Sequence, residues 1–230
     1  MGRSTSSPIL LWIGTLLSGT TSGVLITASP LYLNFLGFPL LEIGLISSLN
    51  YIIFGLLRYL FGRRGDRGGR DVLLRLSPIL LGIISALTPF QISFIGFASL
   101  NLLYGVSNSL QESALSAKII EVGHANQHGT NLGRQVASNA LGFGLGIVVT
   151  GFAIDAFGYT MTFFLGAVSA ILAFIAFTYA PPSTNTITTS EKEKFPKQIQ
   201  PVSRTIKIMI LGMFLVGFGI GFGEVCIMKL

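Results

Sequence analysis

Charged residues are scarce in this sequence. Asp, Glu, Lys and Arg make up 10% of the 230 residues, whereas apolar residues make up 50%. Because water-soluble domains carry about a quarter charged residues, a chain of this composition could not fold in water without exposing large apolar surfaces. The charges stand between apolar stretches of roughly 20 or more residues, the length that crosses a bilayer. The sequence therefore predicts an all-α membrane protein surrounded mainly by the lipid bilayer.

Cysteine, histidine and catalytic motifs are also nearly missing. Cys226 is the one cysteine, which excludes an intramolecular disulfide and a cysteine metal cluster. His124 and His128 have the spacing of helical metal ligands, but glycines bracket them, so a loop is favoured over a zinc site. Neither a G-x-S-x-G nucleophile nor a Walker-type phosphate loop occurs. We expect no metal, no cofactor and no enzymatic activity.

Seven membrane spans are predicted. They cover residues 8–35, 41–62, 72–90, 92–119, 131–154, 159–180 and 206–228. The first apolar run is long enough to span, so we predict an uncleaved helix there and not a cleavable signal peptide. Residues 181–205 begin with two prolines and continue with Ser, Thr, Glu and Lys, which is typical of a polar linker outside the bilayer.

The net charge of +6 indicates orientation. Lys and Arg flank the loops after the second, fourth and sixth predicted spans, whereas the alternate loops around 37–40, 89–91 and 155–158 contain none. Cytoplasmic loops carry such an excess of cations. We therefore expect a multi-pass protein of the plasma membrane with a cytoplasmic amino terminus and linker. Nucleic acid is not an expected partner, because no aromatic platform is interleaved with the cations.

A short pattern occurs twice in the chain. Gly62, Asp66 and Gly69 after the second span are matched by Gly151, Asp155 and Gly158 after the fifth, each as G-x-x-x-D-x-x-G. Arginines surround only the first copy, as opposite sidedness requires, so the pattern favours an inverted repeat of three spans. The alternative is coincidence, since Gly and Asp are common in tight turns.

Residues 62–74, G-R-R-G-D-R-G-G-R-D-V-L-L, resemble the major facilitator loop pattern G-x-L-a-D-r-x-G-r-k-x-x-l. The departures are Arg64 for leucine and Asp71 for lysine. The stretches 104–105 and 141–146 and Glu121 are similar to the family too. The resemblance implies a six-helix bundle of two inverted three-helix repeats at 1–180, a cytoplasmic linker at 181–205, and at 206–230 a seventh transmembrane helix that is the first helix of an incomplete second bundle.

The resemblance also implies a function, secondary active transport of a small solute by alternating access. One half has no closed pathway, so a second half-transporter chain or a homodimer would supply the rest. The alternative is a non-transporting remnant or interaction subunit.

A cytoplasmic latch is implied by the same loop. In the family the residues matching Asp66 and Arg70 form it, with Glu121 as the expected partner of the arginine. A topology signal alone explains the arginines equally well. The residues that carry the match are Gly62, Asp66, Arg67, Gly69, Arg70 and Leu74, of which the first five are the candidate loop and latch residues. From the residues themselves, we expect Asp71 to cap the third helix and the loop glycines to adopt positive backbone angles.

The fourth span carries the densest polar stripe. Asn101, Gly105, Asn108 and Glu112 fall on one narrow helical arc. A carboxylate inside the membrane is costly unless it faces a cavity or a partner, so Glu112, Asn108 and Asn101 are candidates for a substrate or proton pathway. The alternative for Glu112 is a structural ion pair with a cation such as Lys118.

Two other spans add candidates. Thr15, Ser18 and Ser22 would line a central cavity if the fold is as the resemblance implies, although such hydroxyls also bond their own backbone. Glu224 lies deep in the last predicted span. By contrast, we expect Asn50 and Asn139 to serve packing, as should the small-residue strip of Ser138, Gly142, Gly146 and Ala153.

Overall fold

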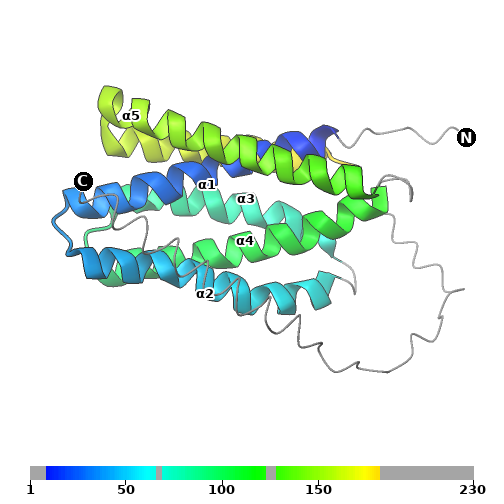
Figure 1. The fold of residues 1–230 in the computed structure, drawn as a ribbon, viewed down its shortest axis with the longest axis horizontal. Helices are drawn as coiled ribbons and strands as arrows, with labels where there is room; N and C mark the ends of the chain where they lie inside the picture. Colours follow the sequence, from blue (N-terminus) through cyan, green and yellow to red (C-terminus); the bar gives the residue numbers. More distant parts are fainter. Residues whose placement is uncertain (1–8, 66–68, 123–127, 182–230) are drawn as a thin grey trace, which may run out of the picture. The chain divides into compact units, whose positions relative to one another are not determined.

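The computed structural model describes residues 9–65, 69–122 and 128–181, and these ranges contain helices and no strands. The helices are α1 (Ile9–Phe35), α2 (Leu40–Gly65), α3 (Arg70–Leu87), α4 (Phe94–Val122) and α5 (His128–Tyr179), with a 3-10 turn η1 (Thr88–Phe90) after α3. They lie side by side along a common direction (Figure 1). The all-α prediction is confirmed. The predicted seventh span at 206–228 lies outside the described residues.

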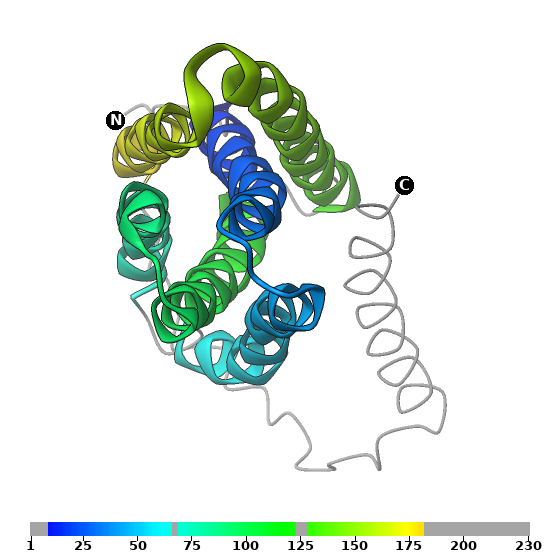
Figure 2. The same cartoon turned by 90° about the vertical axis from the view of Figure 1, so that its left-hand side faces the viewer.

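Helix α5 contains two of the predicted spans. Its backbone leaves helical geometry at Gly158, where φ is 78° and ψ is 176°. The chain reverses direction there, so that a first arm (residues 128–157) and a second arm (residues 159–179) diverge on either side of α1 (Figure 2). Glycine tolerates this positive φ because it has no Cβ. The described chain thus crosses the bundle six times, as predicted.

The two copies of the G-x-x-x-D-x-x-G pattern adopt matching backbone conformations. Gly69 has φ 90° and Gly158 has φ 78°, while Gly62 and Gly151 lie inside helices. The expected positive angle is therefore confirmed at Gly69, but Gly62 continues α2 as a helical residue. Chance occurrence of Gly and Asp in turns would not require this agreement, so the structure favours the inverted repeat.

The pairing of helices is consistent with the inverted repeat. α1 packs against both arms of α5, and α4 packs against α2 and α3. A Cβ at Gly142 or Gly146 would overlap the carbonyl oxygen of Leu16 or Thr20 of α1, respectively. On α4, a Cβ at Gly105 would come within 2.5 Å of the Asn50 carbonyl of α2. The packing role predicted for the small-residue strip is confirmed at Gly142 and Gly146.

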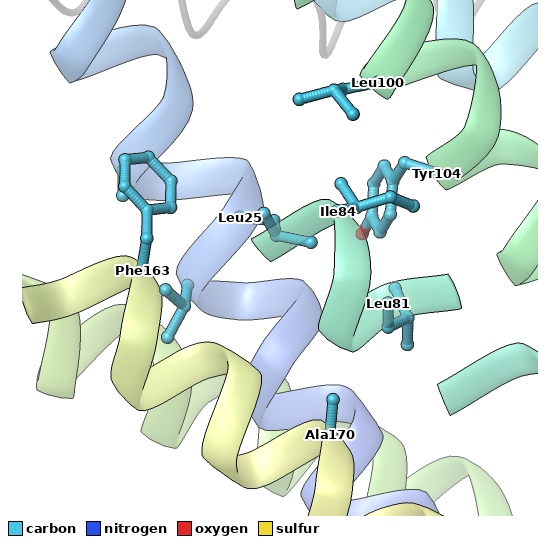
Figure 3. Packing of buried hydrophobic residues seen from close by; sticks show 9 residues of the cluster. Leu25, Leu81, Ile84, Leu100, Tyr104, Phe163 and Ala170 are labelled. Atoms are coloured by element: carbon cyan, nitrogen blue, oxygen red, sulfur yellow. The ribbon is translucent and has the colours of Figure 1, made fainter. Parts of the chain in front are cut away.

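The centre of the bundle is apolar. Leu25 of α1, Ile84 of α3, Tyr104 of α4 and Phe163 of the second arm are almost fully buried and belong to one cluster (Figure 3). Outward-facing positions are apolar as well, among them Leu56, which is 64% exposed. Apolar side chains on both the inside and the outside are expected where lipid is the solvent.

Four helices are long and apolar enough to cross a membrane by length and composition: Ile9–Phe35, Leu40–Arg58, Arg70–Phe90 and His128–Tyr179. Helix α4 is formed where the fourth span was predicted but falls outside this group. Its sequence carries Asn, Ser, Gln, Glu and Lys side chains. These polar groups make α4 the helix on which a functional site is to be sought.

The start of α3 corrects one expectation. The helix begins at Arg70, and its cap residue is Gly69, which makes no side-chain capping hydrogen bond. Asp71 lies inside the first turn and is not the cap. The helix starts two residues earlier than predicted, so Asp71 stands two residues after the cap and cannot accept from the free N–H groups in the capping geometry.

Candidate functional site

Gln111 of α4 is buried and bonded from two sides. Its Nε2 donates to Ser18 Oγ of α1 at 2.7 Å, and its Oε1 accepts from Ser77 Oγ of α3 at 3.1 Å. Ser107, one turn earlier on α4, donates to the Ser77 carbonyl oxygen at 2.9 Å. We call Ser18, Ser77, Ser107 and Gln111 the core polar network. It joins three helices and satisfies polar groups that would be costly to bury alone.

Sequence reasoning missed the core polar network apart from Ser18. The available signal was helical spacing, because Ser107 and Gln111 are four residues apart and form a second polar stripe on α4. This stripe lies about 80° to 140° around the helix from the arc of Asn101 and Glu112. A single-stripe interpretation of α4 therefore overlooked its inward face.

Thr15 and Ser18 do not line an open surface of the described unit. Both are buried, at 0% and 1% exposure. Thr15 Oγ1 donates to the Leu11 carbonyl oxygen at 2.7 Å, and Ser18 Oγ donates to the Thr15 carbonyl oxygen at 3.1 Å. Their hydroxyls are thus satisfied inside the bundle. Ser22, one turn farther along α1, is half-buried.

Asn101, Asn108 and Glu112 are half-buried and lie between two packed faces of α4. One face packs on α2, where Ser109 Oγ donates to the Phe54 carbonyl oxygen at 3.1 Å. The other carries the core polar network. The Asn101 amide donates to its own helix at the Phe97 carbonyl oxygen, 3.2 Å away.

Of the predicted pathway residues that the structure describes, three lack such partners. Within the ranges that the structure describes, Asn108, Glu112 and Ser22 make no side-chain hydrogen bond. The guanidinium of Arg58 on α2 acts on Glu112 electrostatically. In hydrocarbon an unsatisfied polar group costs several kcal/mol. The three groups therefore define the candidate site.

Lys118 is not the partner of Glu112. Its Nζ lies 2.5 Å from Asp71 Oδ1 in the first turn of α3, and the side chains of Lys118 and Asp71 are 1% and 25% exposed. Residues 112 and 118 are six apart, which places them about 120° apart around α4. The ion pair of Glu112 with Lys118 is therefore wrong, whereas the alternative that Glu112 has a structural role beside another cation, here Arg58, stays a prediction.

The loop motif is described in part. Gly69 caps α3, and Arg70 is the half-buried first residue of that helix. Asp66, Arg67 and Glu224 lie outside the described residues, as does the side chain of Glu121. The cytoplasmic latch and the role of Glu224 remain predictions.

A family model for the Major Facilitator Superfamily matches residues 11–228. The chain belongs to the major facilitator superfamily. This family of membrane transporters accounts for the apolar helices, the loop motif and the repeated pattern together.

Individual relatives are more distant and longer. The chain is 28% identical over 173 residues to multidrug resistance protein MdtG of Rahnella sp. (strain Y9602), covering 73% of this chain and 42% of that protein. It is 23% identical over 179 residues to the MFS-type transporter MJ1560 of Methanocaldococcus jannaschii, covering 76% of this chain and 46% of the relative. The chain thus spans less than half the length of these relatives.

Proposed function

We propose that the chain forms the amino-terminal half of a secondary transporter that moves a small solute by alternating access. The family match over residues 11–228 supports transport as the activity. The observation that carries the site is the half-buried stripe on α4, where Asn108 and Glu112 have no hydrogen-bonding partner within the described ranges. Polar groups in this position are stable when they face water or a bound solute.

Depth in the membrane supports the same site. Asn108 stands midway between Phe94 and Val122 of α4, and Ser22 stands midway between Ile9 and Phe35 of α1. If both helices cross the bilayer from end to end, the proposal places these two side chains near its midplane. Secondary transporters bind their solutes at this level, between two bundles.

The wider arrangement is part of the proposal. Residues 1–180 would form the first bundle, 181–205 a cytoplasmic linker and 206–230 the first helix of a second bundle in the plasma membrane. Glu224 would face the pathway from that helix, and Asp66, Arg70 and Glu121 would form a latch at the cytoplasmic end. A second half-transporter chain or another copy of this chain would complete the pathway.

The names of the relatives suggest which solutes to test first. MdtG proteins of Rahnella and of Escherichia coli O6:K15:H31 (strain 536 / UPEC) are named for multidrug resistance, with 28% and 26% identity to this chain. We therefore propose drug molecules as the first panel. The half-buried stripe of Asn101, Asn108 and Glu112 on α4 has hydrogen-bonding groups and one carboxylate, which suit solutes with donor groups.

The competing proposal is a remnant or interaction subunit that transports nothing by itself. The matched region amounts to 42% of MdtG of Rahnella sp., and this proposal concerns that region by itself. The gene sequence downstream of codon 230 separates the two proposals. A continuing frame with five further spans supports the transporter, whereas a stop codon followed by an unrelated gene supports the competing proposal.

Transport itself is tested in proteoliposomes that contain the chain together with its second half. Accumulation of a panel solute above the protein-free background supports the proposal. The matched variant is Asn108→Ala, which removes the amide at the midpoint of α4 and should reduce accumulation. Equal solute levels with and without protein, across the panel, would contradict it.

A further inference from the structure

Gln111 and Glu112 are neighbours in sequence but face different surroundings. In an α-helix adjacent residues point about 100° apart. Gln111 is 6% exposed and bonded inside the bundle, whereas Glu112 is half-buried and makes no hydrogen bond within the described ranges. Whatever fixes the direction of Gln111 therefore also fixes the direction of Glu112.

The hydrogen bonds of Gln111 come from two different helices. The amide nitrogen is held by Ser18 of α1 and the amide oxygen by Ser77 of α3. An amide bonded at both ends to separate helices has one direction in which both bonds are satisfied. Rotation of α4 by one residue would remove both and bury an unsatisfied amide.

Ser107 reinforces this direction. It lies about 40° around α4 from Gln111 and is fully buried. Its hydroxyl donates to the Ser77 carbonyl oxygen and lies 3.2 Å from the Ser77 hydroxyl. Ser107 and Gln111, on successive turns of α4, are thus both bonded to Ser77 of α3.

We propose that Gln111 is a positioning residue that sets the rotation of α4 and thereby presents Asn108 and Glu112 on the candidate pathway. The part that concerns the pathway rests on the proposed function. The rotation of α4 does not, because it depends only on the contacts inside the bundle. The two parts can therefore be tested separately.

Rotation is measured by disulfide crosslinking between α2 and α4. Ser109 Oγ lies 3.1 Å from the Phe54 carbonyl oxygen, so we place cysteines at Phe54 and Ser109 of the full chain in a Cys226→Ala background. Gln111→Leu should lower the crosslinking rate roughly fivefold, the population change that corresponds to one net hydrogen bond. Rates are compared on protein that elutes as a single folded species.

Gln135→Leu is the matched control. Gln135 is buried at 4% exposure, but its Oε1 has no hydrogen-bond partner, so the same substitution removes an amide that holds no other helix. Its crosslinking rate should equal that of the parent.

If Gln111→Leu does not fold, Ser18→Ala removes the acceptor of the Gln111 Nε2 and should also lower the crosslinking rate. An unchanged crosslinking rate in Gln111→Leu, or in Ser18→Ala where that variant is used, overturns the positioning role. An equal fall of the crosslinking rate in Gln135→Leu also overturns it.

Labelling of Asn108→Cys by a water-soluble thiol reagent tests the other part. The parent should react and Gln111→Leu should react roughly fivefold more slowly, while Leu103→Cys on the opposite, exposed face of α4 should stay unlabelled. Slower crosslinking with an unreactive Asn108→Cys parent would overturn the aqueous pathway and leave the positioning of α4 intact. Unchanged crosslinking in Gln111→Leu together with a reactive Asn108→Cys parent would overturn the positioning of α4 and leave the aqueous pathway intact.

Discussion

Lys118 of α4 is paired with Asp71 in the first turn of α3, with 2.5 Å between Nζ and Oδ1. The two side chains are not equally buried, since Lys118 is 1% and Asp71 25% exposed. Buried around the same end of the bundle are Leu74, Leu115 and Phe177. The lysine charge therefore depends on its partner far more than the aspartate does.

This asymmetry predicts unequal effects of removing either partner. Asp71→Asn leaves a buried ammonium without its counter-ion and should destabilise the bundle by about 3 kcal/mol. Lys118→Met fills the same volume with an apolar chain and leaves a carboxylate that water can reach, so its cost should be much smaller. Unfolding in detergent measures both, with the exposed Asp155→Asn as control. Equal losses in the two variants would contradict the assigned burial.

Close packing of α1 on the first arm of α5 predicts a second pair of results. Gly142→Ala places a Cβ against the Leu16 carbonyl, whereas a Cβ at Gly144 meets nothing within 4 Å. The first substitution should destabilise by about 1–3 kcal/mol through overpacking. Gly144→Ala should be neutral or stabilise slightly, because alanine favours the helix. The midpoints of thermal unfolding give the comparison, and similar values for the two variants would argue against the close approach.

The third prediction concerns the side of the membrane on which the loops and the linker lie. Single cysteines at Ser190 and at Pro39, in a Cys226→Ala background, should react with impermeant reagents from opposite sides of the membrane, because the cations cluster on one side. Pro39 should be labelled from outside intact cells and Ser190 only after permeabilisation. Labelling of Ser190→Cys in intact cells would refute the cytoplasmic assignment.

The helices and their order could be predicted from the sequence because lipid requires long apolar segments. Five separate helices and a reversal at Gly158 reproduce the first six spans. The ends were less certain, and Asp71 was wrongly expected to cap α3. Helix ends depend on backbone geometry, here the positive φ of Gly69, which leaves only a weak trace in the sequence.

The site was predicted in part. The arc of Asn101, Asn108 and Glu112 could be derived from spacing, but the direction in which it faces could not. That direction depends on contacts between helices, such as the bond from Gln111 to Ser18 across 93 positions of sequence. For the same reason the burial of Thr15 and Ser18 could not be foreseen, since one helical stripe does not reveal which neighbouring helix covers it.

Glu112 is the residue on which the proposed pathway depends most. In the complete transporter, Glu112→Gln should abolish pH-driven solute accumulation and leave exchange of bound solute largely intact, because exchange needs rocking of the bundles but no net proton movement. Glu42→Gln, which changes an acid in the first turn of α2, is the control and should leave both activities unchanged. If Glu112 served only structure, the variant would reduce the amount of folded protein and leave transport per molecule unchanged. Measured accumulation per folded molecule equal to that of the parent would contradict the proposed pathway.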